Sequence, residues 1–177
     1  MDKLIKTAKT IWITGLSGAG KSTIANELAD ELIKKDIYVV VLDGDTLRGG
    51  LNSDLDYTEK GKAENVRRTA EVAKLLNDSG MNVIVAMISP VAADRDSAKK
   101  IIGERQYKEV YLNTPLSICE ERDVKGLYKK YRDGKLKKFT GITNIYEIPS
   151  QPDLVLDTTV TTVKQCVDII ISKLLNM

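Results

Sequence analysis

The sequence predicts an α/β protein in which a five-stranded parallel sheet carries helices on both faces, giving three layers. Two observations lead to this prediction. Short apolar runs alternate along the chain with longer amphipathic stretches, a pattern typical of parallel strands joined by helices. The second apolar run, residues 38–42, is rich in β-branched Val and has no polar face, as in a strand that is buried on both sides.

The expected elements follow one another in strand–helix order. We expect strands at 10–14, 38–42, 82–87, 109–112 and 154–156, and helices at 21–35, 58–79, 94–102, 115–122 and 162–175. The helix at 58–79 has apolar residues at helical spacing and ends before Gly80. Thr114 and Pro115 predict the start of the helix at 115–122, as N-cap and first-turn residue. Residues 1–177 fit a single domain of ordinary size.

Composition and charge exclude several classes of function. Apolar residues make up 42% of the chain and charged residues 29%, so a core can form without a disulfide or a metal. The formal charge of +2 is too small to indicate nucleic acid or a membrane as partner. Without His, Ser–His nucleophiles and His-ligated metal sites are excluded. Cys119 and Cys166 match no metal-ligand spacing and are interpreted as free thiols in a reducing compartment.

The start of the chain and its apolar runs bear on location. Residues 1–10 carry charges but lack the apolar stretch of a signal peptide. No apolar run reaches the roughly 18 residues of a membrane span. We therefore expect a cytoplasmic protein.

Residues 123–147 break the alternation of strands and helices. They contain no long apolar run but seven basic residues: Lys125, Lys129, Lys130, Arg132, Lys135, Lys137 and Lys138. A solvated basic surface loop is one interpretation. Because long loops inside compact domains are uncommon and often functional, we favour a mobile cationic lid that closes over a polyanionic substrate.

A glycine-rich segment, GLSGAGKS at residues 15–22, matches the pattern G-x-x-x-x-G-K-[ST] in full. Glycines let backbone N–H groups face phosphate oxygens, and the following helix adds its positive end. Lys21 is expected to reach the β- and γ-phosphates, and Ser22 to bind Mg²⁺. Its place between a strand and a helix favours a P-loop NTPase fold that binds ATP and Mg²⁺, rather than an empty turn. The predicted ATP-binding residues are Gly15, Ser17, Gly18, Ala19, Gly20, Lys21, Ser22, Thr23 and Arg122.

Two carboxylates, Asp43 and Asp45, directly follow the second strand. Ligands of open α/β sheets bind beyond the carboxyl ends of the strands, so these side chains are expected near the γ-phosphate. A carboxylate there can hold a metal-bound water or accept the proton of an attacking hydroxyl. A solvent-facing Asp-Gly turn is the alternative. We expect Asp45 to be the catalytic carboxylate and a metal ligand with Ser22, and Asp43 to support it beside the substrate.

A group of polar and basic residues surrounds one aromatic ring: Arg48, Asn52, Tyr57, Lys62, Arg67 and Arg68. Arginine suits paired contacts to phosphate-like oxygens, and an aromatic ring offers a stacking face for a base. From spacing alone, some of these residues are ordinary charges on a helix surface.

The chain resembles the adenylylsulfate kinase family over nearly its whole length. The matching segments are GLSGAGKSTIA, LDGDTLRGGLNSDL, ENVRRTAEVAKLL, ISP followed by DRD, VKGLYKK, FTGI and YEIP. The resemblance implies transfer of the γ-phosphate of ATP to the ribose 3′-hydroxyl of adenylyl sulfate, a role in sulfate assimilation, and a homodimer.

The resemblance also implies roles for single residues. Arg48 and Asn52 would contact the acceptor nucleotide, with Phe139 stacked on one face of its base and Tyr57 on the other. Ser89, in the ISP motif, would be a catalytic residue near the reacting phosphates. Direct in-line transfer requires no phosphorylated serine. The remaining predicted acceptor contacts are Asp43, Lys62, Ile88 and the lid residue Lys125.

Several acceptor-side residues depart from the usual family pattern: Thr46, Gly49, Asp56, Tyr57, Lys62, Met87 and Val91. A lysine cannot reproduce the planar fork of arginine, so Lys62 bears on how the acceptor is held. A kinase for another nucleotide conjugate, such as the cytidine diphosphoramidate of capsule-modification pathways, is therefore an alternative. A GTPase-like switch or silent nucleotide-binding module is a third, although the sequence lacks an N/T-K-x-D guanine-reading motif.

Overall fold

The computed structural model describes residues 8–175, so the expectation that no signal peptide begins the chain falls largely on residues outside this part. Five parallel strands form one sheet in the order β2-β3-β1-β4-β5. They are β1 (Thr10–Thr14), β2 (Val39–Asp43), β3 (Asn82–Ala86), β4 (Tyr107–Leu112) and β5 (Leu154–Leu156). The helices are α2 (Lys21–Ile33), α3 (Gly44–Arg48), α4 (Glu59–Asp78), α5 (Ala92–Ile102), α6 (Leu116–Arg122), α7 (Leu127–Arg132) and α8 (Val163–Ile170), which continues into a π-helical turn, Ile171–Leu175.

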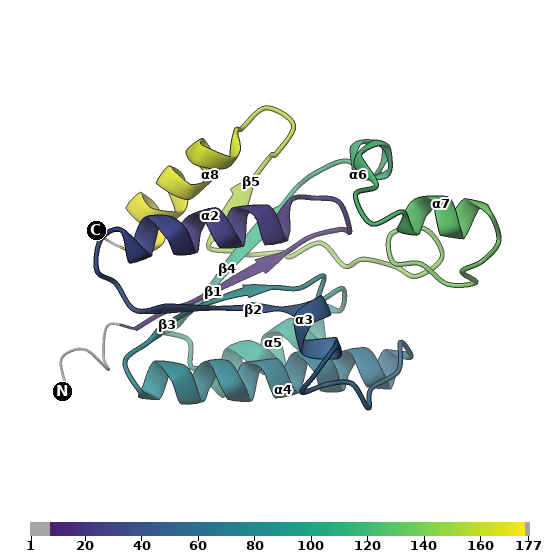
Figure 1. Cartoon of the computed structure of the whole chain (residues 1–177). Helices are drawn as coiled ribbons and strands as arrows, with labels where there is room; N and C mark the ends of the chain where they lie inside the picture. The colour runs from purple at the N-terminus through teal and green to yellow at the C-terminus, as the bar shows by residue number, and fades with distance from the viewer. Residues whose placement is uncertain (1–7, 176–177) are drawn as a thin grey trace.

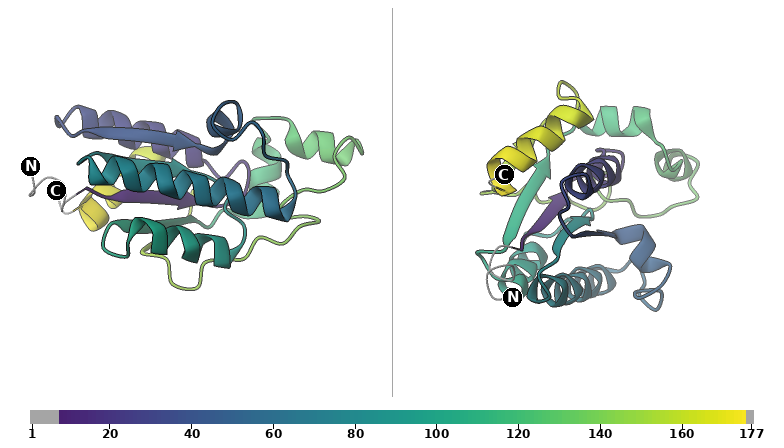
Figure 2. Two further views of the ribbon diagram at one scale, coloured as in Figure 1. Left: turned by 90° about the horizontal axis from the view of Figure 1, so that it is seen from below. Right: turned by 60° about the vertical axis from the view of Figure 1, so that its left-hand side comes forward.

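Helices cover both faces of the sheet. Figure 1 shows α2 and α8 over one face and α4 and α5 over the other, and the two views of Figure 2 show the same layers. The alternation within β1 explains how both faces are filled: Ile11 and Ile13 join the core under α2 and α8, while Trp12 joins the core under α4 and α5. The predicted three-layer α/β fold is confirmed.

Most element boundaries agree with the predictions within a few residues, but two helices, α3 and α7 in the predicted lid, were not expected, and one N-cap was wrong. Helix α3 was not expected, because Asp43-Gly44-Asp45 resembles a turn; the Asp43 side chain instead accepts a hydrogen bond from Asp45 N (2.9 Å) and caps a short helix. Thr114 does not cap α6, whose N-cap is Pro115. The hydroxyl of Thr114 instead lies within hydrogen-bond distance of the Thr158 hydroxyl, at 2.8 Å.

The predicted lid segment, 123–147, contains the helix α7 and is anchored to the rest of the molecule. Tyr128 is buried, and its hydroxyl donates to Ser17 O (2.9 Å) in the glycine-rich loop. The lid therefore contacts the predicted phosphate site directly.

Both cysteines are buried and free, as predicted. Within residues 8–175, no helix is long and apolar enough to cross a bilayer.

Candidate active site

A cavity of about 440 Å³ opens beyond the carboxyl ends of β1, β2 and β3. Of the predicted site residues, it is lined by Ser17, Gly18, Gly20, Lys21, Ser22, Thr23, Asp43, Asp45, Arg48, Tyr57, Lys62, Ile88, Ser89, Arg122 and Lys125. One cavity thus joins the residues predicted for ATP to those predicted for the acceptor.

The glycine-rich loop has the backbone that a phosphate cradle requires. Gly18 has φ +81°, and a Cβ there would lie 2.6 Å from Cys119 O, so only glycine fits. Gly20 has φ +99° and occupies the N-cap of α2, where no side chain caps the helix. The first N–H groups of α2 are therefore free of a side-chain acceptor and suit an anion. Gly15 and Ala19, in the same loop, are buried and do not line the cavity.

Lys21 projects from the first turn of α2 into the base of the cavity. Its Nζ donates to Leu16 O (2.7 Å). Part of its surface stays open to the cavity, yet burial, followed by repulsion from Lys125, lowers the pKa of Lys21 to about 8. Negatively charged phosphates at this position would favour the charged ammonium group.

The carboxylates after β2 have different partners. Ser22 Oγ donates to Asp43 Oδ2 (2.6 Å), so Asp43, rather than Asp45, contacts the hydroxyl expected to bind Mg²⁺. Asp45 is largely exposed in the first turn of α3 and forms an ion pair with Lys125 of the lid. No cluster of three or more His, Cys, Asp or Glu side chains suited to a metal occurs in residues 8–175. The donor set of Ser22 and nearby carboxylates fits Mg²⁺ held jointly by protein and phosphates, because Mg²⁺ usually binds through few protein ligands.

Arg48 and Tyr57 form one wall of the acceptor side. The Arg48 guanidinium carbon lies 4.3 Å from the centroid of the Tyr57 ring, and its Nη1 donates to Leu55 O and Asp56 O, each at 3.1 Å. These contacts fix the guanidinium, while Tyr57 remains 74% exposed.

Lys62 faces the lid from the first turns of α4. Its Nζ lies 3.4 Å from Thr140 Oγ1, and burial, followed by Arg48, lowers the pKa of Lys62. Two positive charges thus approach the same wall of the cavity, an arrangement suited to an anionic acceptor.

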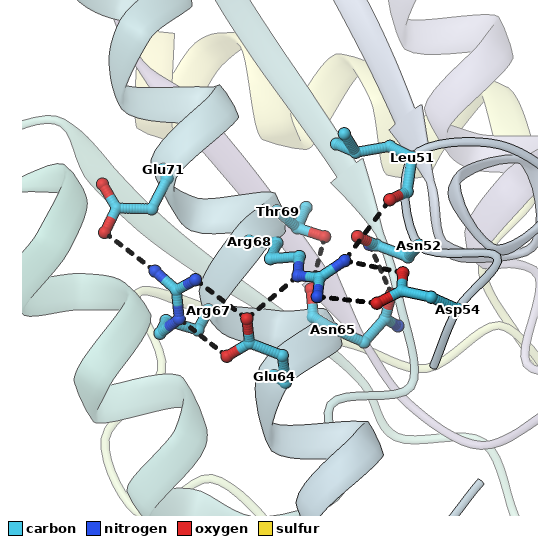
Figure 3. A network of polar contacts seen from close by, with 9 residues as sticks. All are labelled: Leu51, Asn52, Asp54, Glu64, Asn65, Arg67, Arg68, Thr69 and Glu71. Atoms are coloured by element: carbon cyan, nitrogen blue, oxygen red, sulfur yellow. Dashed lines mark hydrogen bonds and ion pairs between the residues drawn. The ribbon is translucent and has the colours of Figure 1, made fainter. Parts of the chain in front are cut away.

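The prediction that Asn52 contacts the acceptor is not supported. Asn52 is fully buried outside the cavity, and its Nδ2 donates to Asn65 Oδ1 (2.7 Å), as Figure 3 shows. Asn65 lines the cavity in its place. The sequence did not identify Asn65 as a cavity residue, because its contact with Asn52 exists only in the folded chain. The only sequence signal was the position of Asn65 in the ENVRR segment.

Arg67 and Arg68 do not line the cavity; Arg68 stabilises the loop that carries Asn52, and Arg67 pairs with Glu64 and Glu71 of its own helix. Arg68 binds both oxygens of Asp54 (2.7 and 2.9 Å), and it shares Glu64 with Arg67 (Figure 3). Hydrogen bonds from Arg67 and then Arg68 lower the pKa of Glu64 to about 2. The interpretation of these two arginines as helix-surface charges is therefore the correct one.

The prediction that Phe139 stacks on a base is also not supported. Its ring is buried in the lid, 4.7 Å from the ring of Tyr128 and 6.1 Å from that of Tyr131, and it does not line the cavity. As the single Phe of the chain, it serves the apolar interior of the lid.

Arg122 closes the far end of the cavity from α6. Its guanidinium donates to Thr158 Oγ1 (2.9 Å) and Thr158 O (2.8 Å). Thr158 and Thr140 also line the cavity; Thr140 belongs to the FTGI segment, although only Phe139 of that segment was predicted to contact a substrate, and Thr158 lies in no matching segment.

Comparison with known proteins assigns the family. The family model for adenylylsulphate kinase matches residues 7–157. The chain belongs to the adenylylsulphate kinase family. A probable adenylyl-sulfate kinase of Halalkalibacterium halodurans is 52% identical over 164 residues, which are 93% of this chain and 79% of that relative. An adenylyl-sulfate kinase of Prochlorococcus marinus is 49% identical over 167 residues, or 94% and 83% of the two chains.

A solved member of the adenylylsulphate kinase family has the same fold. The Mycobacterium tuberculosis APS kinase CysC, in complex with AMPPNP and APS, superposes with a TM-score of 0.91 and 44% identity over 95% of this chain and 98% of that chain. A gluconokinase from Sinorhizobium meliloti, at 16% identity and a TM-score of 0.64, shares the fold alone. Family membership confirms the predicted enzyme class: an ATP-dependent phosphotransferase that acts on a hydroxyl group.

Proposed function

We propose that this member of the adenylylsulphate kinase family transfers the γ-phosphate of ATP to the ribose 3′-hydroxyl of adenylyl sulfate. The observation that carries the proposal is the single cavity bounded by the glycine-rich loop on one side and by Arg48, Lys62 and Asn65 on the other. Two anionic substrates can meet there in one orientation. Relatives with 52% and 49% sequence identity to this chain are named as adenylyl-sulfate kinases, which favours adenylyl sulfate over cytidine diphosphoramidate as the acceptor.

The donor side holds ATP through main-chain N–H groups and Lys21. The N–H groups of the glycine-rich loop and of the uncapped start of α2 donate hydrogen bonds to the phosphates, and Lys21 adds a positive charge next to them. Ser22, whose hydroxyl donates to Asp43, would hold Mg²⁺ together with Asp43 and the phosphates. The ion, when bound, neutralises charge on the phosphate oxygens.

The acceptor side orients a nucleotide that carries an anionic bridge. Arg48 and Lys62 supply positive charge, and Asn65 supplies an amide donor. The exposed ring of Tyr57 offers a stacking surface for the base.

Asp45 is the carboxylate that we assign to the acceptor hydroxyl. It lines the cavity at the end of β2 and pairs with Lys125. Anionic substrates compete for Lys125, so their binding frees Asp45 to accept a hydrogen bond from the hydroxyl. The lid then excludes water and suppresses hydrolysis of ATP.

An assay of ADP formation with different acceptors tests this function. Adenylyl sulfate should stimulate ADP formation strongly, whereas cytidine and uridine diphosphate conjugates should not. Lys21→Ala should abolish the stimulated rate, and Lys34→Ala, an exposed lysine at the end of the same helix, should leave it unchanged. The proposal is wrong if adenylyl sulfate at millimolar concentration gives no stimulation, or if slow ADP formation is the same with every acceptor, as expected for a switch.

We also propose a homodimer that works in the cytoplasm. The dimer is supported by the family resemblance, and its test is a mass in light scattering of twice the 19.6 kDa chain. A cytoplasmic location suits an ATP-dependent enzyme with two free thiols, because that compartment keeps thiols reduced.

A further inference from the structure

Ser89, just after β3, has a backbone that its surroundings must hold in place. It is 3% exposed, and its φ of +43° lies in the left-handed region, which residues other than glycine seldom adopt. Such conformations persist only where the surrounding structure fixes them, and they cluster at functional sites. Two buried side chains, from two different elements, supply the contacts.

The first contact comes from Trp12 in the middle of β1. This residue is 0% exposed, and its Nε1 donates to Ser89 Oγ at 3.0 Å. A buried indole N–H requires an acceptor and can only donate. The bond therefore occupies a lone pair of Ser89 Oγ. This bond does not use the hydroxyl proton of Ser89, which can therefore be donated to a ligand in the cavity that Ser89 lines.

The second contact comes from Arg95 on α5, which is 3% exposed. Its Nη1 donates to Ser89 O (2.7 Å), and its Nη2 donates to Glu147 O (2.8 Å) at the end of the lid. Glu109 on β4 neutralises the guanidinium, with Oε1 2.9 Å from Arg95 Nε. Arg95 thus ties the peptide of Ser89 to the anchored end of the lid.

Both groups that contact Ser89 are hydrogen-bond donors. Within residues 8–175, no carboxylate accepts a hydrogen bond from Ser89 Oγ. A nucleophilic serine requires a base to take its proton, so this environment does not activate the oxygen for attack. It suits a hydroxyl that donates to an oxygen on which negative charge develops.

We propose that Trp12 and Arg95 are positioning residues that aim the Ser89 hydroxyl, as a hydrogen-bond donor, at the phosphoryl group in transfer. The inference rests on the proposed function, because it assigns the group that Ser89 contacts. No covalent bond to Ser89 forms or breaks in this scheme, and the phosphoryl group passes directly between the two substrates.

Kinetics of single and double variants test the coupling to Ser89. Trp12→Phe keeps an aromatic six-membered ring but removes the N–H together with the five-membered ring of the indole, and Arg95→Lys keeps the charge but loses the two-armed contact. Each should lower kcat by about 3- to 10-fold, the range expected for one hydrogen bond, with little change in KM. In a Ser89→Ala background neither substitution should lower kcat further. Losses that multiply in the double variants, or a Trp12→Phe enzyme with full kcat, overturn the proposal.

A spectroscopic test needs no turnover and is independent of the substrate. Trp12 is the only Trp of the chain, so its indole gives one ¹H–¹⁵N cross-peak. Ser89→Ala should shift this peak, and Ser97→Ala, on the exposed surface of α5, should leave it in place. An unmoved peak in Ser89→Ala overturns the proposal, as does an added phosphate mass on Ser89 after incubation with MgATP. Wild-type turnover with adenylyl sulfate, measured first, tests the proposed function separately.

Discussion

The lowered pKa of Lys21 predicts that nucleotide binding takes up a proton in mildly alkaline solution. In the ligand-free protein, burial and the charge of Lys125 lower this pKa to about 8. Phosphate groups next to Nζ favour the charged form and raise the pKa again. At a pH above 8 a neutral lysine must therefore gain a proton when the nucleotide binds.

The size of the effect follows from the pKa. At pH 8.5, about three quarters of the Lys21 side chains are neutral before binding, and at pH 7 only about one tenth are. Binding of MgADP should therefore take up about 0.75 proton at pH 8.5 and about 0.1 at pH 7. The phosphates contribute little at pH 8.5, because their last pKa is about 6. Isothermal titration calorimetry in two buffers of different ionisation enthalpy measures the uptake.

Two variants assign the proton to Lys21. Lys21→Arg stays charged at pH 8.5 and should bind without proton uptake. Lys125→Met removes the second cause of the lowered pKa, so it should reduce the uptake at pH 8.5. Uptake below about 0.2 proton at pH 8.5 in the wild-type protein, or equal uptake in Lys21→Arg, would refute the reasoning.

Three further substitutions test the glycine-rich loop, the lid and the loop 51–54. Gly18→Ala should lower the free energy of unfolding, measured by urea denaturation, by about 1–3 kcal/mol, because Gly18 has a positive φ and a Cβ there would contact Cys119 O. As a control, Gly50→Ala should change the free energy of unfolding by less than about 1 kcal/mol, because a Cβ at Gly50 would have no atom within 4 Å. Lys125→Ala should raise the KM for adenylyl sulfate several-fold and Lys130→Ala should not, since of these two lysines only Lys125 lines the cavity. Equal effects of the two substitutions would mean that the lid contributes only its overall positive charge. Arg68→Gln should raise the same KM by about two- to fivefold and leave that for ATP unchanged, because its salt bridge with Asp54 fixes the loop 51–54, whose Asn52 holds the cavity residue Asn65.

Features that depend on neighbouring residues were predictable from the sequence. The glycine-rich loop needs left-handed glycines, a strand before it and a helix after it, and all of these lie within residues 10–33. Strands β1 and β3 were recognised because a strand buried on both faces is mostly apolar. The expectation that the second strand is buried on both sides was wrong: β2 lies at the edge of the sheet, and Val39, Val40 and Val41 are only partly buried. Helix α3 was the exception, although the Asp43 side chain that caps it is a local signal.

Features that depend on distant contacts were not predictable. Asn52 and Asn65 have the same side chain, and only the fold decides which one faces the cavity. Phe139 could stack on a base or fill the lid, and the choice depends on Tyr128 and Tyr131. The bond between Trp12 and Ser89 joins residues 77 positions apart, and no spacing rule covers such a distance.

The positions that depart from the family pattern now divide into two groups. Four of them do not line the cavity and so do not contact the acceptor directly: Thr46, Gly49, Asp56 and Val91. The departures that line it are Tyr57, Lys62 and Met87. Lys62 keeps the positive charge that an anionic bridge needs, and Tyr57 keeps an aromatic face. What lysine loses is the fork of arginine, and its Nζ points to Thr140 of the lid. In this structure the Lys62 ammonium group therefore lies where the acceptor side of the cavity meets the lid.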